Sequence, residues 1–273
     1  MRRKPASSAV LLLASLVLAA ASPAPAIIPL EPPSDRYNRC LAAARDDPQK
    51  ALSQAESWHD QGGGFPAEHC ADVALIELGR YPEAAQRLQQ LAAAMMQEPP
   101  ELRASALEQA GEAWILANQP DQARISFDAA LSYNPNSADL FVDRAQAYAL
   151  GGHYWEAIDD LNHALAIDPN NVTALIYRAS AYRNAGGADG LTLGLADVNK
   201  ALRLDPGNAT GLLERGNILR LQGDAKGASA AWQQVIKLAP DSLEAKDAQN
   251  NLSHINENAA ASQLLTETPQ QQQ

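Results

Sequence analysis

The sequence predicts an all-α solenoid of stacked helix pairs, and three observations predict this fold class. First, a proline that ends a predicted helix recurs at intervals of 34, 37 and 34 residues. Each proline ends a helix because it disfavours helical geometry in the residue before it. These stops are Pro135, Pro169, Pro206 and Pro240. Second, small and large apolar residues before each stop lie three and four apart, as Ala157, Leu161 and Ala164 do, which places them on one helix face. Third, hydrophobic residues make up 46% of the chain but aromatic residues only 5%, and no segment alternates with the period of a strand.

Four units aligned on these prolines share residue types at the same positions of two predicted helices. In the first helix these positions are Leu107, Gly111 and Trp114, then Phe141, Ala145 and Tyr148, then Leu175, Ala179 and Tyr182, then Leu212, Gly216 and Leu219. In the second helix they are Ala123, Phe127 and Ala130, then Ala157, Leu161 and Ala164, then Gly194, Val198 and Ala201, then Ala228, Trp232 and Val235. This pattern resembles the tetratricopeptide repeat, a helix-turn-helix unit of 34 residues. The resemblance implies a right-handed α-α superhelix with four repeats over residues 101–240.

The N-terminus has the pattern of a secretory signal over residues 1–26, "MRRKPASSAVLLLASLVLAAASPAPA". Basic residues precede an apolar run, and Ala24 and Ala26 flank a predicted cleavage site after Ala26. The alternative is an uncleaved anchor, although the run is short for a bilayer span. Cleavage would change the formal charge from −11 to −14, since it removes three cations. Such a surface repels nucleic acids and anionic lipids, so we expect neither nucleic-acid binding nor membrane insertion of the mature chain.

A linker over residues 27–34 and divergent helix pairs over residues 35–100 are expected next. The stretch "ALIELGRYPEAAQRLQQLAAAM" fits the repeat, whereas residues 35–61 fit it less well. The segments "YNRCLAAARDDPQKALSQAESW" and "FPAEHCADVALIELGRYPEAA" resemble an N-terminal module of exported bacterial tetratricopeptide proteins. This resemblance implies a bacterial periplasmic location.

The two cysteines, Cys40 and Cys70, fall on the first helices of these two adjacent pairs. An exported chain meets an oxidising compartment, and an even number of cysteines favours a bridge. We therefore predict a Cys40–Cys70 disulfide; the alternative is two separate buried thiols.

The remaining predictions concern the 37-residue unit and the C-terminus. The three extra residues of that unit lie within "NAGGADGLTLGLADV", where its two helices join, and predict a surface bulge. A capping helix with a polar outer face is expected over residues 241–256, because a solenoid must cover its last apolar face. The Gln-rich tail, 257–273, is expected to be disordered.

No residue set predicts catalysis, a cofactor or a metal. The five histidines lack metal-ligand spacing. Asp159 and Asp160 could form a carboxylate pair, but Asp160 and Asp197 recur at one position of the second helices, as Arg144, Arg178 and Arg215 do in the first helices. This repetition favours a ladder of structural ion pairs over a catalytic site.

The resemblance implies a non-catalytic module that binds a protein or peptide segment in a concave groove lined by the first helices. Groove positions transferred from the family are Glu108, Glu112, Asp139, Asp143, Tyr177, Ser180, Arg183, Asn184, Asn217 and Arg220. The groove should be acidic at one end and mildly basic at the other. Basic residues of the partner would lie over the acidic end, with carboxylates at Arg183 and Arg220. Two alternatives stay open: the four acidic residues form only a solvated face, or the protein is a scaffold that assembles through its convex face. The oligomeric state is not predicted.

Overall fold

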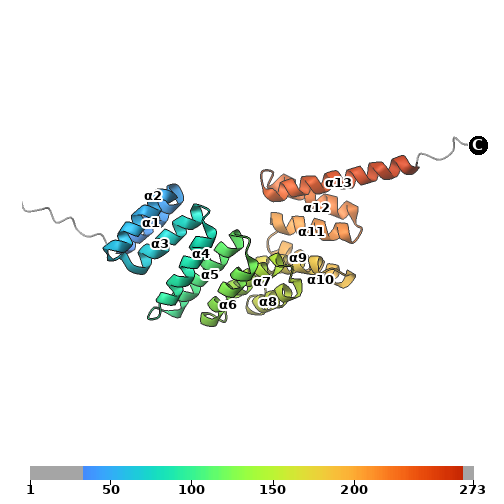
Figure 1. The fold of residues 1–273 in the computed structure, drawn as a ribbon. Coiled ribbons are helices and arrows are strands. Elements are labelled where there is room, and N and C mark those ends of the chain that lie inside the picture. The colour runs from blue at the N-terminus through green and yellow to red at the C-terminus, as the bar shows by residue number, and fades with distance from the viewer. Residues whose placement is uncertain (1–32, 267–273) are drawn as a thin grey trace, which may run out of the picture.

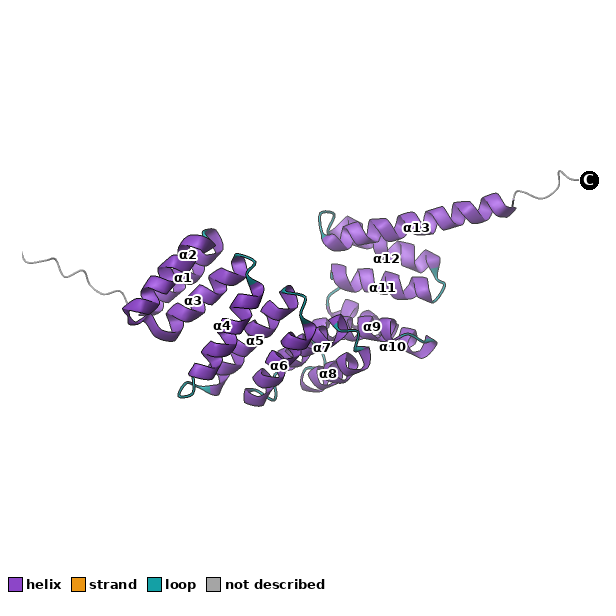
Figure 2. Ribbon diagram, in the orientation of Figure 1, coloured by secondary structure: helices purple, strands orange, loops and turns teal. Residues whose placement is uncertain are grey.

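A computed structural model describes residues 33–266, so the predicted signal and all but the last two residues of the predicted linker lie outside the described part. The described chain is helical and confirms the predicted α-α solenoid (Figures 1 and 2). The helices are α1 (Pro33–Asp46), α2 (Pro48–Trp58), η1 (His59–Gly63), α3 (Gly64–Glu77), α4 (Tyr81–Ala94), α5 (Pro100–Leu116), α6 (Pro120–Tyr133), α7 (Ala138–Leu150), α8 (Tyr154–Ile167), α9 (Val172–Ala185), α10 (Ala188–Leu204), α11 (Ala209–Leu221), α12 (Ala225–Leu238) and α13 (Leu243–Thr266).

The helices form two layers that follow the order of the sequence along a curved path (Figure 1). Each helix packs against the next one in the chain, as expected for a solenoid in which each repeat contacts its neighbours. The first helices of successive pairs also pack on one another, α5 on α7, α7 on α9, and α9 on α11. In a curved stack the inner layer has the closer neighbours, so the first helices line the concave side.

The intra-pair turns after α3, α5, α7, α9 and α11 each contain a residue with positive φ, whereas the turn between α1 and α2 does not. In the turn after α7, Gly152 has φ of 78°, and the amide of His153 donates to the carbonyl of Tyr148. The turn after α5 has the same bonds, but Asn118 takes the left-handed position with φ of 55°. Asn118 is the one non-glycine residue with positive φ among residues 33–266. Asparagine and glycine tolerate this conformation best, which explains the choice at this position.

The predicted surface bulge in the 37-residue unit is wrong. The helix α10 has 17 residues, whereas its counterpart α8 has 14, so the extra residues lengthen the helix at its N-terminal end. The turn itself is made by Gly186 and Gly187, with φ of 86° and 85°. Gly190 lies buried in the added turn, and a β-carbon there would approach the carbonyl oxygen of Tyr182 to 2.9 Å. An added helical turn keeps its backbone hydrogen bonds, which a bulge would lose.

The C-terminal helix α13 packs on α11 and α12 and buries Ala245 and Ala248. It continues to Thr266, ten residues beyond the predicted end of the cap. The expectation of disorder from residue 257 is therefore wrong for residues 257–266, and residues 267–273 lie outside the described part. The composition of the tail suggested no apolar stripe, but the first turns of α13 are anchored by packing and the helix propagates from them.

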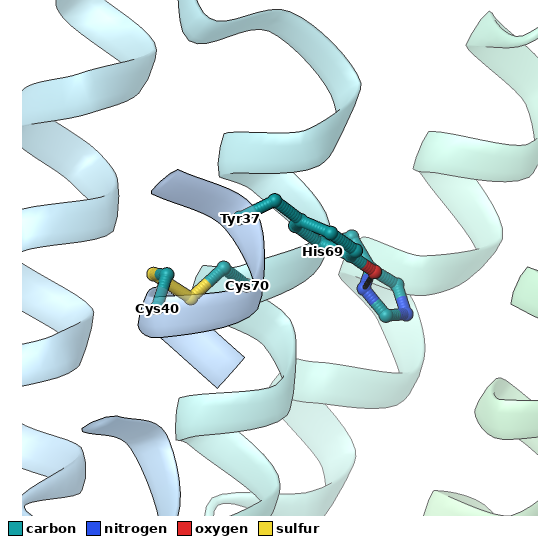
Figure 3. Close-up of a disulfide and its surroundings, with 4 residues drawn as sticks. All are labelled: Tyr37, Cys40, His69 and Cys70. Carbon is teal, nitrogen blue, oxygen red and sulfur yellow. Dashed lines mark hydrogen bonds between the residues drawn. A yellow bond between two sulfur atoms is a disulfide. The ribbon is translucent and has the colours of Figure 1, made fainter. Parts of the chain in front are cut away.

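The predicted disulfide between Cys40 of α1 and Cys70 of α3 is confirmed (Figure 3). The two Cα atoms are 6.1 Å apart, within the range that a bridge requires. Cys70 is fully buried, whereas Cys40 is partly exposed. The bond ties the first helix pair to the second, at the end of the solenoid where α1 has neighbours on one side only.

Candidate partner-binding groove

All ten predicted groove residues lie on first helices, two each on α5, α7 and α11 and four on α9. The structure divides them into four acidic residues, three residues that line a pocket, two residues engaged within the chain, and the exposed Arg220.

The acidic group consists of Glu108 and Glu112 of α5 and of Asp139 and Asp143 of α7. Burial and the charges of the other three carboxylates raise the pKa of Asp143 to about 7. Burial, Glu112 and Asp139 raise the pKa of Glu108, and burial raises the pKa of Glu112. Within residues 33–266 no cation pairs with any of these side chains. The groove therefore holds uncompensated negative charge, and a cation placed there would relieve the repulsion.

A pocket of about 280 Å³ lies next to the acidic group, between α7 and α9. Three predicted residues line it, Tyr177, Ser180 and Asn184. The sequence did not predict a pocket here; its other walls are Gln146 and Leu150 of α7, Tyr154 and Leu161 of α8, and alanines of α7, α8 and α9. Burial, and after it the charge of Asp143, raises the pKa of Tyr177, so Asp143 lies near the Tyr177 wall of the pocket.

Arg183 is already paired within the chain, which corrects its expected role as a free carboxylate-binding group. Its Nε donates to Glu214 Oε1 at 2.6 Å and its Nη2 donates to Glu214 Oε2 at 3.1 Å. Glu214 is buried on α11, so this pair joins two successive repeats. Sequence reasoning missed it because the residues are 31 apart and do not recur in the other units.

The predicted basic end of the groove is reduced to Arg220, which is exposed. Asn217 Oδ1 accepts a hydrogen bond of 3.1 Å from Asn251 Nδ2 of α13. The capping helix therefore reaches this end of the groove and engages Asn217.

Two predicted ion pairs of the ladder are present. Arg144 makes a bidentate pair with Asp160, at 2.8 and 2.6 Å, and Arg178 makes one with Asp197, at 2.7 and 2.8 Å. The hydrogen bond to Asp160 raises the pKa of Arg144. Arg215 has no carboxylate opposite it, since Ala231 stands at the matching position, and its buried Nε has no hydrogen-bond partner among the described residues. These contacts give Asp160 and Asp197 a structural role.

Neither a metal centre nor a membrane span is found in the part of the chain that the structure describes. Residues 33–266 contain no group of three or more His, Cys, Asp or Glu side chains that could hold a metal ion. None of the helices in that range combines the length and apolar character needed to cross a bilayer.

Comparisons with known proteins agree on the repeat. Residues 138–171 and 211–242 each match the tetratricopeptide repeat family. No curated protein matches the chain. MamA from Desulfovibrio magneticus RS-1, residues 41 to the end, is similar at a TM-score of 0.55 and 22% identity, over 65% of this chain and 97% of that one. YrrB, described as a TPR protein with an unusual peptide-binding site, is similar at a TM-score of 0.50 and 17% identity, over 71% of this chain and 96% of that one. At these identities the similarity to solved structures is one of fold.

Proposed function

Because this chain is a tetratricopeptide repeat protein, we propose that it binds an extended segment of a partner protein along its first helices. The fold alone does not give this function. The observation that carries the proposal is the acidic group beside the pocket between α7 and α9. Four carboxylates without cationic partners lie together there; burial and the neighbouring carboxylates raise the pKa of Glu108 and of Asp143, so this arrangement is unfavourable in the isolated chain.

The partner segment is basic where it crosses α5 and α7. A Lys or Arg side chain over Glu112 and Asp143 would stabilise their ionised forms. A neighbouring side chain of the partner would enter the pocket at Tyr177, whose walls offer apolar surface together with the polar groups of Ser180 and Asn184. Arg183 supports the pocket and does not bind the partner in this proposal, because it donates to Glu214 and, at the pocket, to Asn184 Oδ1 and Ser180 Oγ.

The cellular setting that we propose is the bacterial periplasm. The signal pattern of residues 1–26 and the Cys40–Cys70 disulfide support export, since disulfides persist in oxidising compartments. Determining the N-terminal residue of the protein recovered from the periplasm tests this location. A chain that begins at Ile27 supports it, and an intact Met1 in a membrane fraction contradicts it.

One observation favours the second candidate function, a scaffold that assembles through its outer face. Ile125 of α6, Trp155 of α8 and Leu193 of α10 are all second-helix residues with exposed side chains. Large apolar groups on the outer layer could contact another protein.

Charge reversal separates the two candidates. In the variant Glu112→Lys/Asp143→Lys, the affinity for a partner captured from the periplasm should fall at least tenfold, and salt should weaken wild-type binding. The control Asp159→Lys reverses an exposed charge on α8 and should leave the affinity unchanged. Unchanged binding in the double variant, with folding intact, would contradict the groove and favour the outer face.

A further inference from the structure

A second pocket, of about 410 Å³, lies near the N-terminal end of the solenoid among α1, α3, α4 and α5. We call it the N-terminal pocket. Its walls are largely apolar and are formed by Phe65, Pro66, Leu91, Met95, Leu102 and Ala106. Leu91, Met95 and Ala106 are buried, while Leu102, at the side of the pocket, is 49% exposed. A concave apolar surface of this size can bury a large side chain.

Three polar side chains at the edge of this pocket, Tyr37, His69 and Gln109, are hydrogen-bonded to one another. His69 lies between the hydroxyl of Tyr37, 2.7 Å from Nδ1, and Gln109 Oε1, 2.9 Å from Nε2 (Figure 3 shows the Tyr37 side). Because Gln109 Oε1 can only accept, Nε2 of His69 donates and Nδ1 accepts from Tyr37. Burial lowers the pKa of His69, which agrees with this neutral ring. The pocket therefore suits a ligand group that needs no hydrogen bond.

The disulfide fixes one wall of the pocket. Tyr37 lies one helical turn before Cys40 on α1, and His69 precedes Cys70 on α3 (Figure 3). Among the described helices α1 packs mainly on α2 and α3, so the bond helps to hold Tyr37 against His69. A pocket that is formed in advance loses less entropy when a ligand binds.

The helix α5 contributes both to the N-terminal pocket and to the acidic group. Gln109 of α5 lines the pocket, and Glu108 and Glu112 of the acidic group lie one residue before it and three residues after it. Glu98, another carboxylate without an ion pair among the described residues, stands at the pocket. The apolar site is therefore bordered by negative charge.

We propose that the N-terminal pocket binds a bulky apolar side chain of a basic, extended partner segment. The segment is the one that crosses the acidic group, so this inference rests on the proposed function. Neighbouring helices lie about 8–10 Å apart, and an extended chain advances about 3.3 Å per residue. The apolar side chain and the nearest Lys or Arg are therefore about three residues apart.

A synthetic peptide tests this arrangement. Because it carries Lys three residues before and three residues after its Leu, it fits whichever way the partner segment runs along the groove. The probe is a fluorescently labelled peptide, Lys-Lys-Ala-Ala-Leu-Ala-Ala-Lys-Lys, and its comparison peptide has Ala in place of Leu. Affinities are measured by fluorescence anisotropy at low salt for the oxidised wild type, for Leu102→Gln and for the matched control Leu116→Gln. Leu116 is 55% exposed on the same helix but does not line the pocket.

The Leu peptide should bind wild type and Leu116→Gln about tenfold more tightly than the Ala peptide, and this ratio should fall to about two or less in Leu102→Gln. An equal ratio in all three proteins overturns the N-terminal pocket. If that happens while Glu112→Lys/Asp143→Lys still weakens both peptides, the proposed groove stands without the pocket. If wild type binds neither peptide, both are contradicted.

Discussion

Gly216 of α11 and Trp232 of α12 fit together so closely that a β-carbon on Gly216 would lie 2.5 Å from Trp232 Cδ1. Gly111 and Phe127 are related in the same way in an earlier repeat. The two intervening repeats pair Ala with a smaller partner, Leu161 or Val198. Across these repeats a smaller first-helix residue faces a larger second-helix residue, and a larger one faces a smaller one. The distance between the two layers therefore stays nearly constant.

The first prediction follows from this complementarity. Gly216→Ala should destabilise the fold by about 1 to 3 kcal/mol, because the buried indole of Trp232 has no room to retreat. Adding Trp232→Leu to Gly216→Ala should recover part of this loss, since the pair then resembles Ala145 and Leu161. Urea unfolding of the single and double variants measures the coupling. Gly207→Ala, in an open turn, is the control, and equal losses in Gly207→Ala and Gly216→Ala would contradict the account.

The second prediction concerns the ion pair of Arg178 and Asp197. Arg178→Ala should lower the free energy of unfolding by about 2 to 3 kcal/mol, because it leaves a largely buried carboxylate without its partner. The value lies below that of a fully buried pair, since the side chain of Arg178 is 21% exposed. Arg203→Ala, an exposed change on α10, should have little effect. A melting temperature that Arg178→Ala leaves unchanged would show that the ladder does not stabilise the fold.

The third prediction is a pH dependence at Asp143, whose pKa the fold raises to about 7. The groups that face it are Glu108, Glu112, Asp139 and Tyr177. Between pH 4 and 7 the folded chain binds more protons at this site than the unfolded chain. The contribution of Asp143 to the free energy of unfolding is therefore greatest below the pKa that Asp143 has in the unfolded chain. This contribution is lost as the pH rises through 7.

Replacing this carboxylate should remove that dependence. Asp143→Asn should stabilise the protein by about 1 kcal/mol at pH 8, a value reduced by solvent screening, and by less at pH 5. Thermal melts at both pH values measure the difference. Asp159→Asn, on the exposed face of α8, should show no such trend. A stabilisation that grows toward pH 5 would reverse the sign and contradict the account.

The fourth prediction concerns the disulfide. In Cys40→Ser/Cys70→Ser the N-terminal helix pairs should lose about 3 to 4 kcal/mol of stability, the model-dependent value for a loop of this length. Because a solenoid is stabilised by contacts between neighbours, the loss should be local. Hydrogen exchange should quicken in α1 to α3 and stay nearly unchanged in α11 and α12. Uniform loss of protection along the chain would show that the solenoid unfolds as one unit.

The sequence predicted the features that recur and the single Cys40–Cys70 disulfide, but it missed other contacts that occur once. The proline stops, the apolar stripes and the paired Arg and Asp of two repeats follow the period, so each unit supports the interpretation of the others. The Arg183–Glu214 pair joins first helices of different repeats and has no counterpart, and only the packed structure brings these residues together.

The acidic half of the groove was predicted more completely than its basic half. Glu108, Glu112 and Asp143 lie together, as expected from the transferred positions; besides burial, the neighbouring carboxylates raise the pKa of Glu108 and of Asp143. On the basic side, Arg183 and Asn217 are engaged by Glu214 and Asn251. A pattern of positions identifies which side chains share a face, but it does not show which of them already have partners.

The central claim, that a partner lies in the groove, is tested most directly by crosslinking in cells. A photo-crosslinking amino acid replaces Gln146, which lines the pocket between α7 and α9, or Leu193, which is exposed on the outer helix α10. We predict that position 146 crosslinks to a partner, that position 193 does not, and that Glu112→Lys/Asp143→Lys abolishes the crosslink. Crosslinks from position 193 alone, unaffected by the charge reversals, would contradict the account.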